Sequence, residues 1–247
     1  MMSVGGGLTA VERRGDTVRR LGGEWTPAVH ALLQHLHHVG FAAAPRVLGM
    51  DGAVEVLGFV PGVGPTHADD ELSRVSELIR ALHAATGSFV APPEARWQFM
   101  VGAPREGAVI CHNDLSPDNT IYEPAGTPSA FIDWDLAAPA PPLWDIAWAA
   151  YRFVPLYDEE TCQRLGFPLG RQAERLRILC DGYGLRERED LLPTVCERIR
   201  VLYDTARTWG QAGRVGWRDV WAATRGEQWL RGLSYVEAQR ATWERSL

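Results

Sequence analysis

The pattern of hydrophobic and polar residues divides the chain into a strand-rich beginning and a mainly helical remainder. Segments that alternate between apolar and polar residues predict two hairpins, with strands at residues 9–14, 17–21, 45–50 and 53–60. Between the hairpins, apolar side chains recur at helical spacing from Thr26, the predicted N-cap, through the first-turn Pro27 to Gly40. We therefore expect a small sheet with one helix at the start of the chain.

A segment rich in proline and glycine, residues 61–65, interrupts this periodicity and predicts a link between two lobes, residues 1–60 and residues 66–247. Beyond it, the apolar pattern predicts helices near residues 72–87, 143–153 and 171–245, and short strands at residues 108–111 and 130–132. This order predicts an α+β fold with a small β-rich N-lobe and a larger, mainly helical C-lobe.

Polar side chains follow both short strands of the second lobe at the point where each strand ends. His112 and Asp114 follow the first strand, and Asn119 comes five positions after Asp114. Asp133 and then Asp135 follow the second strand. Carboxylate and amide oxygens are the ligands that Mg²⁺ prefers, and a carboxylate can take the proton of an acceptor hydroxyl. These residue types are therefore the ones that phosphoryl transfer requires.

The same motifs resemble the aminoglycoside phosphotransferase and choline kinase-like family, which shares the protein-kinase fold. The family's His-x-Asp-x-x-x-x-Asn loop is matched by His112, Asp114 and Asn119. Its Ile-Asp-Trp strand end is matched by residues 132–134, and its Pro-x-x-Asp-Leu-Ala helix start by residues 142–147. The complete spacing is far more specific than a lone His-x-Asp.

The resemblance implies a role for each matched residue. Asp114 would be the catalytic base, while Asn119 and Asp133 would hold magnesium. Asp145 would brace the catalytic loop from below. His112 is counted with Asp114 among the catalytic residues. Its favoured role is to brace the loop and not to act as a general base. The resemblance also implies ATP and Mg²⁺ as cofactors.

The sequence departs from the family at the residue that binds the ATP phosphates, because all 25 basic residues are arginine and none is lysine. The family places a lysine on a small-lobe strand and orients it with a glutamate from the next helix. If Val18 faces the core, alternation puts Arg20 and not Arg19 on the inner face. His30 occupies the glutamate position, with Glu24 as an upstream alternative.

Two further segments bear on nucleotide binding. Phe59 and Val60, directly before the predicted link, are expected to contact the nucleotide. The glycine run at residues 5–7 is the candidate turn over the phosphates. A GxxxxGK motif is absent, which excludes a P-loop enzyme.

The sequence thus predicts an ATP- and Mg²⁺-dependent phosphotransferase that acts on a hydroxyl of a small molecule, with antibiotic resistance as one implied role. The acceptor stays open between aminoglycosides, other antibiotics, choline-like amino alcohols and sugars. The replacement of lysine motivates an alternative, a weak or inactive kinase-like nucleotide-binding protein acting in immunity or regulation. A third hypothesis is a metal-dependent hydrolase using His112, Asp114, Asp133 and Asp135, although no further histidine falls at ligand spacing.

The composition of the chain limits which partners and which cellular location we expect. The net charge of −6 and the lack of a basic stripe argue against nucleic acid, and no apolar run is long enough to span a membrane. The N-terminus lacks a signal-peptide pattern, so a cytoplasmic location is expected. The four cysteines form no CxxC pair and are expected to be reduced. We expect a monomer or a weak dimer.

Overall fold

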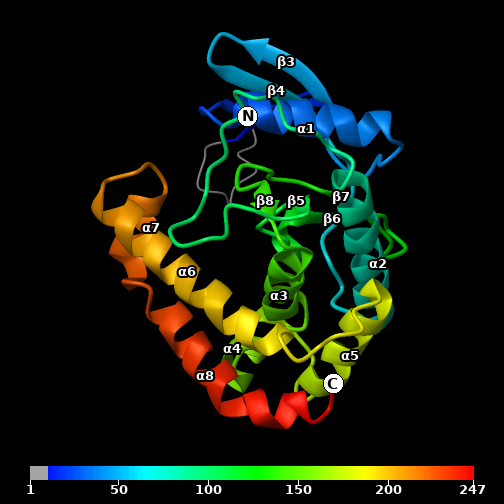
Figure 1. The fold of residues 1–247 in the computed structure, drawn as a ribbon, viewed down its shortest axis with the longest axis vertical. Helices are drawn as coiled ribbons and strands as arrows, with labels where there is room; N and C mark the ends of the chain where they lie inside the picture. Colours follow the sequence, from blue (N-terminus) through cyan, green and yellow to red (C-terminus); the bar gives the residue numbers. More distant parts are fainter. Residues whose placement is uncertain (1–10) are drawn as a thin grey trace.

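The computed structural model describes residues 11–247, and the glycine run at residues 5–7 lies outside them. The chain begins with an antiparallel sheet in the order β1-β2-β4-β3. Its strands are β1 (Glu12–Arg14), β2 (Thr17–Leu21), β3 (Val47–Asp51) and β4 (Val54–Gly58). Both predicted hairpins are confirmed over the described residues, and the sheet lies beside a single helix (Figure 1).

That helix, α1, spans Thr26–His38 and buries the apolar face that its spacing predicts. The predicted N-cap is wrong by one residue, because Trp25 occupies the cap and Thr26 is the first helical residue. The Thr26 hydroxyl instead accepts a hydrogen bond of 2.8 Å from the backbone N–H of Gly23, which fixes the entry to the helix.

The rest of the chain is mainly helical, as predicted. Two short antiparallel pairs carry the loops of interest: β5 (Val109–Cys111) with β8 (Ala138–Ala140), and β6 (Thr120–Tyr122) with β7 (Pro128–Phe131). The helices are α2 (Asp69–Thr86), α3 (Pro142–Phe153), α4 (Glu159–Leu165), α5 (Gln172–Tyr183), α6 (Leu191–Gln211), α7 (Trp217–Thr224) and α8 (Glu227–Glu244). The sequence did not predict β6, β8 or α4, because each is too short to display a period.

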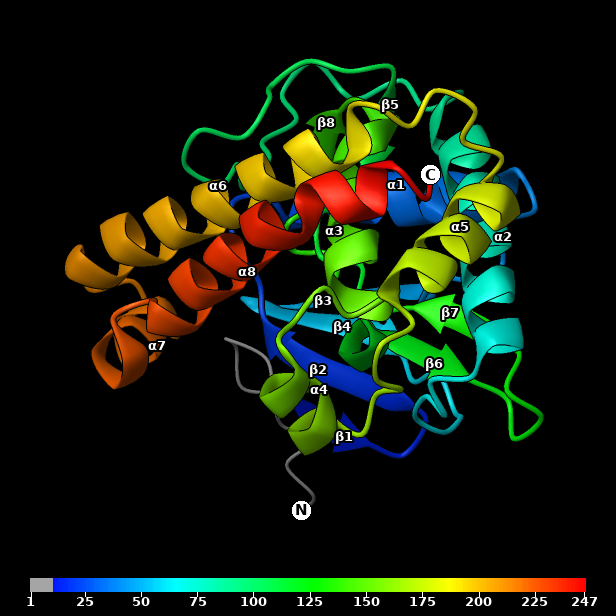
Figure 2. The ribbon, with the colours of Figure 1, turned by 90° about the horizontal axis from the view of Figure 1, so that it is seen from below.

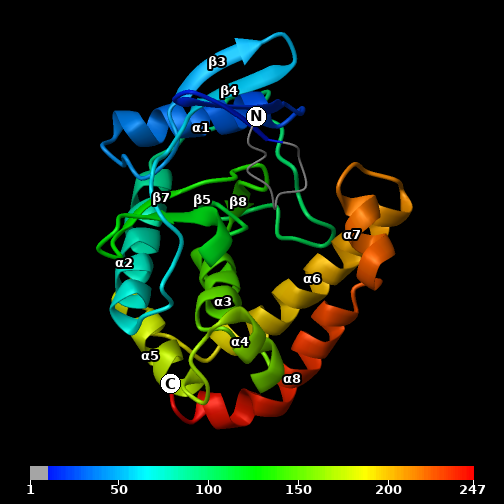
Figure 3. The same cartoon turned by 180° about the vertical axis from the view of Figure 1, so that it is seen from behind.

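The short strand pairs lie between the N-terminal sheet and the body of helices (Figure 1). Seen from below, α6 and α8 run side by side, and α7 lies at the far end of α6 (Figure 2). The view from behind shows α2 and α5 on the opposite side of α3 from α7 (Figure 3). The loop that follows β7 reaches the N-terminal sheet, because Asp133 and Asp135 contact Arg20 of β2.

The two parts of the chain share one core. A continuous cluster of buried side chains includes Leu36 of α1 and Leu57 of β4 together with residues of α2, α3, α5 and α6. The segment between the parts is also tied down, because Val63 exchanges backbone hydrogen bonds of 2.8 and 3.0 Å with Tyr122. Within residues 11–247, no helix combines the length and the apolar character needed to cross a bilayer.

Candidate active site

The loop after β5 is suspended from the carboxylate of Asp145, in the first turn of α3. Backbone N–H groups of His112 and Asn113 each donate to it at 2.7 Å, and His83 Nε2 lies 3.2 Å away. Burial by itself would raise the pKa of Asp145, but the hydrogen bond and charge of His83, with the N–H donors of the loop, hold it below its usual value. An ionised carboxylate thus fixes the backbone that leads to Asp114.

His112 is fully buried and joins the two strand-end loops. Its Nε2 lies 3.0 Å from the carbonyl oxygen of Ile132, and its Nδ1 lies 3.3 Å from the backbone N–H of Asp114. Because a carbonyl only accepts and an N–H only donates, Nε2 carries the proton and Nδ1 the lone pair. With both ring nitrogens engaged by backbone, His112 offers no ligand for the hydrolase hypothesis.

Asp114 is held by two side-chain donors. Asn119 Nδ2 lies 2.8 Å from Asp114 Oδ2, and the indole Nε1 of Trp148 donates to Oδ1 at 3.2 Å. The Ser116 hydroxyl accepts from the backbone N–H of Asn119 at 3.3 Å, which stabilises the short 3₁₀ turn that orients this amide. Burial raises the pKa of Asp114 above its ordinary value. A carboxylate in this setting is oriented and more basic than one in water.

Arg20 lies opposite, on β2, and each of its three types of N–H group meets a different carboxylate. Nε donates to Glu55 at 2.6 Å, Nη1 to Asp133 at 2.9 Å and Nη2 to Asp135 at 2.6 Å. Burial alone would lower the pKa of Arg20, but the negative charges of Asp135, Glu55 and Asp133 raise it well above the ordinary value. The guanidinium therefore stays charged and bridges the N-terminal sheet to the loop after β7.

The neighbouring arginine faces the other way, since Arg19 pairs with Asp51 at the exposed face of the sheet. Glu55 stands opposite Arg20 in the β2–β4 register. His30 Nε2 lies 2.8 Å from Glu55 Oε1, so this histidine reaches Arg20 through Glu55. Glu24, the alternative at this position, is exposed and pairs with Arg96 away from the site.

The side chains at this site offer the types of ligand that magnesium prefers. Asp133 and Asn119 supply a carboxylate and an amide, and the amide nitrogen of Asn119, not its oxygen, makes both contacts to Asp114. Asp133 also adopts a positive φ of 63° and Asn113 one of 66°, conformations that are unusual for residues other than glycine. Hard oxygens at two loop ends fit Mg²⁺, but Arg20 already contacts one of the Asp133 oxygens.

Three residues of this cluster escaped the sequence analysis: Glu55, Trp148 and Arg198. Arg198 is fully buried, donates to the carbonyl oxygen of Asn113 at 2.6 Å, and lies 5.0 Å from the ring of Trp148. Burial lowers its pKa to about 10. Only Glu55 left a signal in the sequence, as a charged residue on the same strand face as the buried Leu57.

Asp135 does not face water as an isolated loop carboxylate would, because its side chain is only 17% exposed and pairs with Arg20. Phe59 and Val60 are half-buried at the end of β4. The Arg13 guanidinium lies 3.5 Å above the Phe59 ring. Nucleotide contact by these two residues stays a prediction.

One buried trio of potential metal ligands, His83, Cys111 and Asp145, occurs in the described part of the chain. Both Asp145 oxygens already accept backbone N–H groups, so this trio supports the loop. Two histidines near the end of α1, His35 and His37, contact backbone carbonyls. His38, the last residue of the same helix, is exposed.

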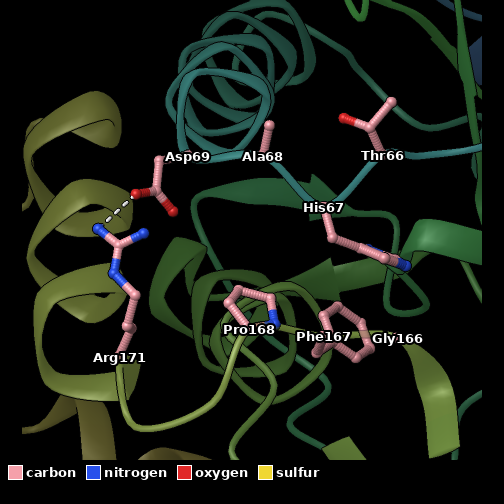
Figure 4. Close-up of a pocket in the computed structure, with 8 residues that line it drawn as sticks. All are labelled: Thr66, His67, Ala68, Asp69, Gly166, Phe167, Pro168 and Arg171. Atoms are coloured by element: carbon pink, nitrogen blue, oxygen red, sulfur yellow. Dashed lines mark ion pairs between the residues drawn. The ribbon is translucent and has the colours of Figure 1, made fainter. Parts of the chain in front are cut away.

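A separate hollow of about 430 Å³ lies between the start of α2 and the loop before α5 (Figure 4). The ring of His67 packs on that of Phe167 at 4.0 Å on one side. On the other side, Asp69 pairs with Arg171 at 2.7 Å. None of its lining residues belongs to the predicted catalytic set.

Comparison with known proteins places these features in a family. The model of the phosphotransferase enzyme family matches residues 91–179, which include both strand-end loops and Asp145. The trifolitoxin immunity protein of Rhizobium leguminosarum bv. trifolii is 36% identical over 195 residues, covering 75% of this chain and 74% of that protein. The chain belongs to the aminoglycoside phosphotransferase and choline kinase-like family.

Solved structures of this phosphotransferase family share the fold. A choline kinase from Streptococcus pneumoniae superposes with a TM-score of 0.60 at 12% identity, over 96% of this chain and 92% of that one. An aminoglycoside phosphotransferase from Streptomyces rimosus, in complex with ADP and streptomycin, gives 0.51 at 17% identity, over 78% and 90%. The predicted α+β, protein-kinase-like fold is thereby confirmed.

Proposed function

We propose that this phosphotransferase-family protein transfers the γ-phosphate of ATP to a hydroxyl of a small molecule, with Mg²⁺ as the metal. One observation carries the proposal. The Asp114 carboxylate is oriented by Asn119 and Trp148 on a loop suspended from Asp145, and His112 of this loop contacts the carbonyl oxygen of Ile132, the residue before Asp133. A strand-end base beside a strand-end metal ligand is what an in-line transfer to a hydroxyl needs.

In this proposal each side chain has one task. Asp114 accepts the proton of the acceptor hydroxyl, whose oxygen forms a bond to the γ-phosphorus as the bond to the ADP oxygen breaks. Asn119 and Asp133 would hold Mg²⁺, which neutralises phosphate charge when bound. Arg20 would contact the phosphates through its planar fork. His112 and Asp145 keep the loop in place without touching the substrate.

The acceptor is proposed only as a class, a small molecule with a free hydroxyl. The family includes proteins named for choline and for aminoglycosides, and one solved relative carries streptomycin. Acting on such a molecule inside the cell would make this a cytoplasmic enzyme, in which antibiotic resistance is one outcome.

A second candidate is a binding protein of immunity that turns over slowly or not at all. Two features favour it: the chain has no lysine to take the phosphate-binding role that the family gives to that residue, and three carboxylates engage the guanidinium of Arg20. The 36% identical relative is named an immunity protein for trifolitoxin. A protein that only sequesters its ligand would need the residues proposed to face the nucleotide for its folded stability. It would not need Asp114 as a base.

Incubation with ATP, Mg²⁺ and a panel of alcohols and antibiotics, read by mass spectrometry, separates the candidates. A product 80 Da heavier, absent with Asp114→Asn, supports phosphotransfer (~80 Da is the mass of an added HPO₃ group). Tight binding of a panel member without any product, unchanged by Asp114→Asn, supports the second candidate instead. The Asp118→Asn variant serves as the matched control, because Asp118 lies four residues after the base but is exposed and pairs with Arg152.

A further inference from the structure

The three contacts of Arg20 are not equivalent. The Nε contact goes to Glu55, which is 1% exposed and belongs to the same sheet as Arg20. The two Nη contacts go to Asp133 and Asp135, whose side chains are 35% and 17% exposed. One side of the guanidinium is therefore fixed inside the sheet, while its fork faces a loop at the proposed phosphate site.

Glu55 is a firm anchor because it is itself held. Burial would raise its pKa, but the hydrogen bond from His30 and the charge of Arg20 lower it, so the carboxylate is ionised. An ionised carboxylate only accepts, so the His30 Nε2–H donates to Oε1 and leaves Oε2 for Arg20. Helix α1 thus reaches the arginine through an intermediate residue on β4.

The charges around Arg20 do not balance. Three carboxylates, those of Glu55, Asp133 and Asp135, surround one guanidinium. A divalent cation at Asp133 would bind the same carboxylate that Nη1 of Arg20 now contacts. Cation and fork therefore compete, and binding of one favours release of the other.

We propose that Glu55, held by His30, is a positioning residue that retains Arg20 by its Nε while the Nη fork exchanges between Asp133–Asp135 and the phosphates of a nucleotide. Uptake of a divalent cation at Asp133 drives the exchange. This inference rests on the proposed function, because it assumes a nucleotide at this site. Glu55 on strand β4, supported by His30, thus takes the orienting role that the family gives to a glutamate on a helix.

The first test measures competition without any turnover. Binding of Mn²⁺ alone, followed by electron paramagnetic resonance, reports the affinity of the carboxylates for a cation. Removal of the competing fork in Arg20→Met should tighten Mn²⁺ binding about tenfold. Arg20→Lys, which keeps the charge but can reach fewer carboxylates, should fall between the two. Equal affinity in all three proteins overturns the competition.

The second test asks whether Glu55 acts through Arg20. In the wild-type background, Glu55→Gln should weaken Mn²⁺ binding. The positive charge of Arg20 is then balanced by Asp133 and Asp135 alone, so the fork competes more strongly with the cation. The substitution should also weaken binding of a fluorescent ATP analogue about five- to tenfold, because the fork loses its anchor. In the Arg20→Met background the same substitution should have a much smaller effect on both ligands. Such non-additivity is the signature of a residue acting through another.

Asp51→Asn provides the matched control, since Asp51 pairs with Arg19 on the other face of the same sheet. It should leave both affinities unchanged. Thermal melting of each variant shows whether it is folded. If Arg20→Met does not fold, Asp135→Asn is used in its place. This substitution removes the charged partner of Nη2, so it should release the fork and tighten nucleotide binding.

The outcomes separate this inference from the proposed function. Additive effects of Glu55→Gln and Arg20→Met, in a protein that binds Mn²⁺ and nucleotide, overturn the positioning role and leave the proposed function intact. A wild-type protein that binds neither Mn²⁺ nor the nucleotide analogue contradicts the proposed function and this inference together.

Discussion

Trp148 donates its indole N–H to Oδ1 of Asp114 at 3.2 Å, so a tryptophan of α3 orients the carboxylate proposed as the base. Asp114 already has a raised pKa because it is buried, and this hydrogen bond opposes the rise. The bond favours the ionised form, which is the form that accepts a proton.

Trp148→Phe should therefore raise the pKa of Asp114 further. Because the base must be ionised, the acidic limb of the kcat profile should move up by about one pH unit, the worth of one hydrogen bond to a charge. A pH–rate series on both proteins measures this. A phenyl ring takes the place of the indole beside Arg198, so the variant is expected to fold. An unshifted limb would mean that Asp114 does not set the profile.

Asp114→Asn should keep ATP binding and lower turnover roughly 10²–10⁴-fold, the usual worth of a general base. Nucleotide titration and a product assay on the same preparation measure the two effects. Asp118→Asn, at an exposed carboxylate that pairs with Arg152, should change neither. Near-normal turnover in Asp114→Asn would remove the base assignment.

Asp133→Ala should abolish the magnesium dependence of nucleotide binding, because it removes a strand-end carboxylate proposed as the main protein ligand of the ion. It also frees one Nη group of Arg20. Calorimetry with ATP, in the presence and absence of Mg²⁺, compares the two affinities. An unchanged metal dependence would show that Asp133 serves only as a partner of Arg20.

Arg20→Ala should weaken ATP binding and turnover together, because a contact made in both the ground state and the transition state is lost. Arg20→Lys should recover little if the planar fork is required, and more if charge alone matters. Arg19→Ala is the matched control, because Arg19 lies on the opposite strand face. A large loss at Arg19 with none at Arg20 would reverse the assignment.

Asp145→Asn should lower the free energy of unfolding by about 2–4 kcal/mol, because an amide has one acceptor oxygen for the two backbone N–H groups that the carboxylate serves. Denaturant titration measures the loss. The pKa of Asp145 is depressed in the folded protein, so its contribution is present above the pKa of the unfolded state. It is lost as pH falls through the folded value, and the difference between wild type and variant should shrink on acidification.

The sequence by itself determined the parts of the site that are local. Apolar runs that end in polar residues place Asp114 and Asp133 just beyond strand ends, and alternation in β2 separates Arg20 from Arg19. Helical spacing likewise identifies α1 and the buried face that it presents. In each case the signal and its structural consequence lie within a few residues of each other, so periodicity and turn chemistry suffice.

Only the tertiary structure decided which side chains meet. Asp135 lies 115 residues from Arg20, and Trp148 lies 34 residues from Asp114. Arg198 reaches Asn113 across 85 residues. No spacing rule connects such pairs, because the packing of α3, α6 and the sheet against one core sets their distances. The ionic partners of Arg20, and with them the competition proposed at Asp133, therefore follow from how the elements pack together.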